Sequence, residues 1–115
     1  MTVSAEEAFR RLTIGDTAVV GRDPGSDVPA LCRLDGRTAA LVRIGALVAV
    51  GAPATSYRTA VQAALRNGAR LDELLGVMIA VADTVGTARV VEAAPTIALE
   101  AGYDVETALE QHVVD

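Results

Sequence analysis

Apolar residues recur along this chain every three or four positions, which is the spacing of one helix face. The best-defined stripe comprises Tyr57, Ala60, Val61, Ala64 and Leu65. Its opposite side is polar and carries Arg58, Thr59, Gln62 and Arg66. Gly68 follows as a left-handed helix stop, and the β-branched residues of the chain fall within the same helical spacing. The chain is therefore predicted to be all-α.

About six helices follow from the pattern. Ser4 and Glu7 have the spacing of a capping box, so a first helix is expected to run to about residue 12. Others are expected at about 36–50, 71–85, 87–101 and 104–113, the second capped by Asp35 and the last by Asp104. The striped helix is expected to begin near Pro53, with Thr55 or Ser56 as its side-chain cap. Pro95 predicts a kink or a break in the fifth helix.

Residues 13–34 differ from the rest because glycines and prolines interrupt them. They are expected to form an irregular arm, with a brief extended piece at 17–20. The predicted organisation is a single domain over residues 1–115. Within it, residues 1–34 form the N-terminal helix and arm, and residues 35–115 form the helical core.

Composition limits the classes of partner. The net charge is −5, the pI is near 4.7, and all ten cationic residues are Arg, which argues against binding a nucleic-acid backbone. Aromatic residues make up only 3% of the chain, so Ala, Val and Leu must form the core. Because small side chains bury little area, we expect a homo-oligomer built through the second to fifth helices.

A cytoplasmic location is expected. Cys32 is the single cysteine, so no internal disulfide forms, which fits a reducing compartment. The acidic, amphipathic N-terminus lacks the order of a signal peptide. The longest apolar run, about 39–54, contains Arg43 and Pro53 and is too short to span a bilayer, so no membrane role is expected.

Two segments carry a resemblance to a known family. "LDGRTAALVRIGALVAVGA" (34–52) and "ALRNGARLDELLGVMIAVADTVGTARVVEAA" (64–94) resemble the carboxymuconolactone decarboxylase and alkylhydroperoxidase-D-like family. The resemblance covers roughly residues 34–101. Its most specific part is a helix ending "A-L-x-x-G", followed by an acidic pair and an apolar helix. It implies an all-helical domain that assembles as trimers, hexamers or larger rings.

The catalytic residues that the resemblance implies are absent. The positions of the peroxidase-type cysteine pair and histidine carry Pro53, Ser56 and Ala60. The positions of the decarboxylase-type glutamate and histidines carry Ala40, Ala60 and Ala80. Alkyl groups do not transfer protons, and neither a proline ring nor a hydroxyl replaces a thiolate. We therefore expect no thiol peroxidase activity.

Metal and cofactor chemistry are not expected either. The only histidine, His112, is most simply a cation near a helix C-terminus, and no ligand spacing surrounds it. Cys32 lies in the arm with no histidine near it in sequence. No cofactor motif is present.

Four residues are candidates for binding a small anion or carboxylate: Tyr57, Arg58, Arg43 and Asp83. Tyr57 and Arg58 lie beside the positions where the family's site opens, and Tyr57 is alternatively a core or interface aromatic. Arg43 and Asp83 lie in apolar helices, where a buried charge needs a partner. They are alternatively an ion pair with each other, or a charge at a subunit interface. Arg89 and Glu92 are most simply a solvated i,i+3 pair.

These observations leave three hypotheses about the function of the chain. The first is a carboxymuconolactone-decarboxylase-like protein with altered small-molecule chemistry or ligand binding, and the second is a non-catalytic oligomeric binding or scaffolding protein. The third, a thiol peroxidase that uses Cys32, lacks an activating neighbour in the sequence. Whether the chain is an enzyme is left open. A pocket of a few hundred Å³ with converging polar groups favours the first hypothesis, and a pocket filled by side chains favours the second.

Overall fold

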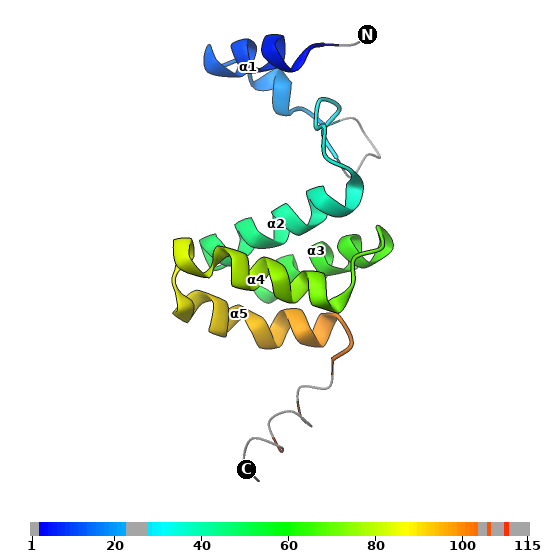
Figure 1. The fold of residues 1–115 in the computed structure, drawn as a ribbon, viewed down its shortest axis with the longest axis vertical. Helices are drawn as coiled ribbons and strands as arrows, with labels where there is room; N and C mark the ends of the chain where they lie inside the picture. The colour runs from blue at the N-terminus through cyan, green and yellow to red at the C-terminus, as the bar shows by residue number, and fades with distance from the viewer. Residues whose placement is uncertain (1–2, 23–27, 104–105, 107–109, 111–115) are drawn as a thin grey trace. The chain divides into compact units, whose positions relative to one another are not determined.

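The computed structural model describes residues 3–22, 28–103, 106 and 110, and within them it is all-helical (Figure 1). These residues form the α-helices α1 to α5 and one short 3-10 helix, η1. The predicted helix at 104–113 and His112 fall almost wholly outside the described residues. The chain divides into two compact units, Met1–Gly36 and Arg37–Asp115. That the whole chain forms one domain stays a prediction.

In the first unit, α1 spans Ala5–Thr13 and begins as predicted. The Ser4 hydroxyl accepts the Glu7 backbone N–H at 3.1 Å. The Glu7 carboxylate does not follow the capping-box pattern, because it accepts hydrogen bonds of 2.8–3.0 Å from Arg10 and Arg11. Such charge-assisted bonds are stronger than a bond to a neutral amide, and they lower the pKa of Glu7 to about 2.

The arm contains a helical turn where an extended piece was expected, so that prediction was wrong. The 3-10 helix η1 spans Thr17–Val20, and the Asp16 carboxylate accepts the Ala18 N–H at its start at 3.0 Å. An aspartate in this position favours a local turn over an extended strand. η1 packs on α1.

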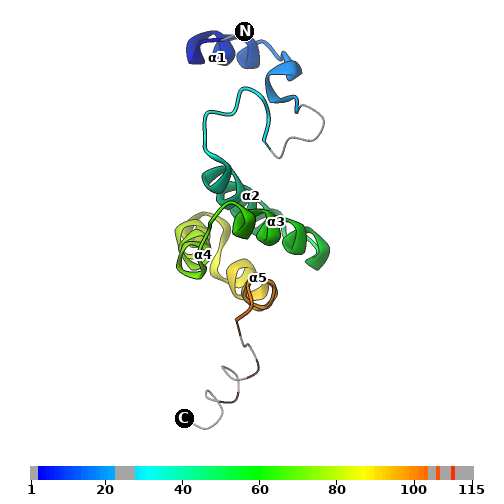
Figure 2. The ribbon, with the colours of Figure 1, turned by 90° about the vertical axis from the view of Figure 1, so that its right-hand side faces the viewer.

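The second unit holds four helices: α2 (Gly36–Val50), α3 (Ala54–Arg66), α4 (Leu71–Val85) and α5 (Thr87–Glu100). Figure 1 shows that α4 and α5 run antiparallel to each other and that α2 runs in roughly the same direction as α4. Figure 2 shows α5 nearly end-on, with α4 to its left and α3 above it and extending to its right. α5 packs against both α3 and α4 and is the helix that they share.

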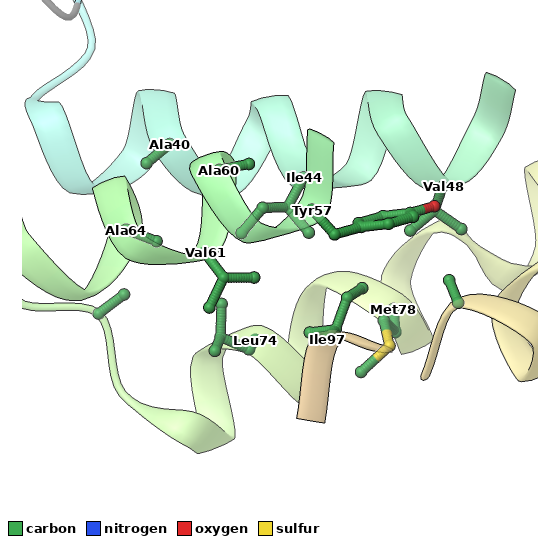
Figure 3. Close-up of a cluster of buried hydrophobic side chains, with 12 residues drawn as sticks. Ala40, Ile44, Val48, Tyr57, Ala60, Val61, Ala64, Leu74, Met78 and Ile97 are labelled. Carbon is green, nitrogen blue, oxygen red and sulfur yellow. The ribbon is translucent and has the colours of Figure 1, made fainter. Parts of the chain in front are cut away.

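The core of this unit lies between the four helices and is built largely from small side chains (Figure 3). Its largest fully buried side chains are Ile44, Leu74, Ile97, Val48 and Val61. Buried alanines fill the remaining positions, chiefly on α2 and α3. Tyr57 is the one aromatic residue of this core. Within the described residues, no polar or charged side chain is buried.

Gly45 allows α2 to approach α4 closely. A Cβ added at this buried glycine would lie 3.2 Å from Val81 Cγ1 and 3.4 Å from Val77 Cγ1. Glycine inside a helix ordinarily costs stability. Here the two valines pack into the space that a side chain at position 45 would occupy.

The structure lacks the predicted break in α5 and the predicted side-chain cap of α3, so these two predictions were wrong, whereas a kink at Pro95 stays a prediction. α5 continues through Pro95 without a break, because Pro95 is on the exposed side of the helix. The carbonyl of Val91, which loses its amide partner there, belongs to a residue 64% exposed and so has access to water. α3 begins at Ala54 after Pro53 with no side-chain cap, which places Thr55 and Ser56 inside the helix.

The role of Gly45 leads to a stability prediction. We expect Gly45→Val to lower the free energy of unfolding by about 1–3 kcal/mol, because its added carbons overpack the α2–α4 contact. Gly76→Ala is the matched control, since an added Cβ at this exposed glycine of α4 meets nothing within 4 Å. This control should raise stability by about 0.5–1 kcal/mol. Urea unfolding followed by circular dichroism measures both, and a stable Gly45→Val variant would contradict the proposed packing.

Candidate functional site

A pocket of about 380 Å³ lies where the start of α3 meets the first part of α5. One side is formed by the α2–α3 connection and the first turn of α3, with Gly51, Ala52, Pro53, Ala54 and Tyr57. The other side is formed by α5, with Arg89, Glu92, Ala93 and Thr96. The lining is therefore a backbone turn facing a mostly polar helix surface.

A tight turn shapes the first side of the pocket. Gly51 has a φ of +64°, which glycine adopts without strain, and it reverses the chain just after α2. The Ala52 N–H then donates to the Leu47 carbonyl at 3.1 Å, and the Ser56 N–H to the Pro53 carbonyl at 3.0 Å. Because Pro53 provides no side-chain cap, the first amides of α3 begin at the pocket with no side chain covering them.

Tyr57 forms the inner wall, and the prediction that it turns inward is confirmed, since it is only 4% exposed. Figure 3 shows its ring lying along the core near Val48. Its hydroxyl donates to the Leu47 carbonyl at 3.2 Å. Burial raises the pKa of Tyr57 and the negative charge of Glu92 raises it further, while the positive charge of Arg89 lowers it. The phenol is therefore neutral at neutral pH.

Arg89 and Glu92 supply the charges of the pocket. Both belong to the polar face of α5 and are exposed. The Arg89 guanidinium lies against the turn, because a Cβ added at Gly51 would come within 2.5 Å of its Nη1 atom. Across the described part of the chain, neither Arg89 nor Glu92 has an ion-pair partner within 4 Å. The two side chains therefore do not close on each other.

The other three predicted site residues lie outside the pocket. Arg58 is exposed on α3, and its Nε atom pairs with the Glu100 Oε1 atom at 3.4 Å. Arg43 is half-buried on α2 and has an interaction of its own. Asp83 is exposed on α4, so the expectation of a buried charge there was wrong, because its position lies on the side of α4 that faces water. A ligand-binding role for these three stays a prediction.

The part of the site that α5 contributes was not predicted from the sequence. Arg89 and Glu92 were interpreted as a solvated pair, and Thr96 was not singled out. A signal was present, since residues 89, 92 and 96 follow one another at three- and four-residue steps. The pattern shows that these residues share a face, but only the packing of α5 on α3 shows what that face meets.

The arrangement suits binding more clearly than nucleophilic chemistry. Arg89 and the uncapped start of α3 attract an anion, whereas the Glu92 carboxylate accepts hydrogen bonds. The nine lining residues include the hydroxyls of Tyr57 and Thr96 but neither thiol nor imidazole. Glu92 is the one carboxylate among them.

Searched over the described residues, no cluster of three or more His, Cys, Asp and Glu residues has the geometry of a metal site. In the same part of the chain, each helix is too short or too polar to cross a lipid bilayer. Comparisons with known proteins yield no match, whether to family models, curated proteins or solved structures.

The hydroxyl of Tyr57 leads to a prediction on stability and its pH dependence. Tyr57→Phe should lower the free energy of unfolding at pH 7 by about 0.5–1.5 kcal/mol, because the Leu47 carbonyl loses one of its two donors. The raised pKa stabilises the fold fully below pH ~10, and this contribution is lost as pH rises through the folded-state pKa. The difference between the two proteins should therefore shrink in alkaline solution.

Tyr103→Phe serves as the control, because Tyr103 is 46% exposed. Ultraviolet absorbance should show a late-titrating tyrosine that disappears in Tyr57→Phe and remains in Tyr103→Phe. The same late titration in Tyr57→Phe would contradict the assignment.

Proposed function

We propose that this chain is a carboxymuconolactone-decarboxylase-like protein whose α3–α5 pocket binds a small carboxylate, without thiol peroxidase activity. The observation that carries the proposal is the Arg89 guanidinium, which lines a pocket of about 380 Å³ and has no ion-pair partner among the described residues. An unmatched guanidinium in a concave site is suited to bidentate binding of a carboxylate.

The position of Arg89 along α5 supports a role in binding. Arg89 is the third residue of this helix, where the positive end of the helix dipole disfavours a cation. The start of α3 adds a second positive end beside the same pocket. An anion in the pocket relieves the repulsion that these groups otherwise experience.

The positions singled out by the resemblance also support ligand binding over thiol chemistry. Pro53, at the place of a family cysteine, lines the pocket. Ser56 is half-buried one turn further along α3, and Ala60 is buried in the core. Cys32 belongs to the other compact unit of the chain. The proposed pocket therefore adjoins the family's reactive position but presents charge where that chemistry needs sulfur.

Carboxylate binding is tested with Arg89→Gln. Butyrate and benzoate, titrated into the full chain and followed by nuclear magnetic resonance, should shift the amides of residues 51–57 and 89–96. Arg89→Gln should weaken this binding about 10-fold or more, since a hydrogen bond to a charged group contributes about 1.5–3 kcal/mol.

Arg37→Gln is the matched control, because Arg37 is an arginine of α2 whose partner, Glu73, lies outside the pocket lining. It should bind as the unaltered protein does. Equal affinities for Arg89→Gln and the unaltered chain, or shifts confined to other helices, would contradict the proposal.

A second candidate function, an oligomeric scaffold, is favoured by the apolar surface of α4 and α5. A groove of about 360 Å³ runs between these helices and is lined almost entirely by apolar side chains. Large exposed side chains line or border it, namely Leu71, Leu75, Ile79, Val91 and Tyr103. We refer to these five residues and the groove as the α4–α5 face.

We propose that a second copy of the chain covers this face. The five residues are 46–65% exposed, and a cluster of large exposed apolar side chains is typical of a protein–protein interaction site. The ridge of Leu71 and Leu75 on α4 has the shape that packs into a groove between two helices. The face thus offers both a ridge and a groove to an identical face.

Self-association is tested with Leu75→Glu. Leu75 is 52% exposed and lines the groove, so a carboxylate there should favour the monomer without disturbing the core. Val42→Glu is the control, because Val42 is similarly exposed, at 58%, but belongs to α2. Light scattering at micromolar concentration should show an oligomer for the unaltered chain and Val42→Glu, and a smaller mass for Leu75→Glu. A monomeric unaltered chain would exclude this scaffold role.

A further inference from the structure

Two opposite charges, Arg89 and Glu92, line the α3–α5 pocket and indicate the class of ligand that it binds. We infer that the ligand of this pocket is a small zwitterion, with a carboxylate that binds Arg89 and an ammonium group that binds Glu92. The inference rests on the proposed function and names the class of carboxylate that the pocket selects.

The first observation is that Arg89 and Glu92 are placed to pair and do not. They are three residues apart on α5, so their Cβ atoms are about 5–6 Å from each other, and such pairs readily form contacts on a helix surface. Nevertheless, within the residues that the structure describes, no ion pair joins them or engages either one. Each charge is thus presented to the pocket separately.

The second observation explains how the charges stay separate. The Arg89 guanidinium is directed to the α2–α3 turn, where the absence of a side chain at Gly51 makes room for it. Glu92 follows one turn later on α5, and its charge acts on the Tyr57 hydroxyl. The positive charge therefore lies by the turn and the uncapped start of α3, and the negative charge lies further along α5.

Other classes of ligand match this arrangement less well. A dicarboxylate would place its second negative charge near Glu92, and an amine without a carboxylate would meet Arg89 and the start of α3. An apolar ligand would displace water from both charges and replace it with no partner. A molecule with both charges offers each group a charged partner.

The size of the pocket limits the molecule. At about 30 Å³ for each water, a volume of 380 Å³ corresponds to roughly a dozen waters. A ligand with up to about that many non-hydrogen atoms fits, which is the size of a free amino acid or a short ω-amino acid.

The experiment compares four-carbon probes on the full chain. Butyrate carries only the carboxylate, 2-aminobutyrate and 4-aminobutyrate add an ammonium group at two different distances, butylamine carries only the ammonium group, and succinate carries two carboxylates. Amide shifts in residues 51–57 and 89–96 give the affinity of each. One of the aminobutyrates should bind at least threefold more tightly than butyrate. Butylamine and succinate should both bind more weakly than that aminobutyrate.

Glu92→Gln then tests the partner of the ammonium group. The ratio of aminobutyrate affinity to butyrate affinity should fall to about one, and Thr84→Ala, on an exposed site of α4, should keep the ratio of the unaltered chain. A ratio unchanged in Glu92→Gln, or butyrate or succinate binding as tightly as both aminobutyrates, would overturn the zwitterion inference and leave carboxylate binding standing. If no carboxylate probe shifts these amides, the proposed function fails, and this inference fails with it.

Discussion

The carbonyl of Leu47, near the end of α2, accepts two hydrogen bonds on which the pocket depends. One comes from the Ala52 N–H and closes the turn around Gly51, and the other comes from the Tyr57 hydroxyl one turn into α3. Together they tie the end of α2 to the start of α3. The turn therefore has a defined position, against which Arg89 packs and from which the uncapped amides of α3 begin. The charges of α5 acquire a shared pocket only because this backbone wall is held in place.

Side-chain size sets the distances between the helices. The core of Arg37–Asp115 is filled mainly by alanine, valine, leucine and isoleucine, and α2 approaches α4 where Gly45 leaves room for Val77 and Val81. Helices that pack so closely enclose little space between them. The spaces that remain lie at the edges, in the pocket at the start of α3 and in the groove between α4 and α5. Both the proposed binding site and the proposed interface are therefore at the rim of the helical unit.

The sequence predicted the helices well because their limits depend on local chemistry. α4 spans the expected residues, since Arg70 and Glu73 define its start and Gly86 its end, and the inward position of Tyr57 follows from the spacing of its stripe. The capping of α3 was mispredicted because Pro53 itself starts the helix. The roles of Arg89 and Glu92 were missed for a different reason. A polar helix face has the same sequence pattern whether it faces water or another helix. The pocket depends on the packing of α5 on α3, which the sequence of a short segment does not reveal.

Pro95 has a consequence for the cooperativity of α5. It removes one amide from the middle of the hydrogen-bond ladder, between the turn that carries Arg89 and Glu92 and the turn that Ile97 anchors in the core. In shape α5 is one helix, but in local unfolding its two halves are less strongly coupled than those of an unbroken ladder. The half that borders the pocket is therefore able to fray and re-form while Ile97 stays buried.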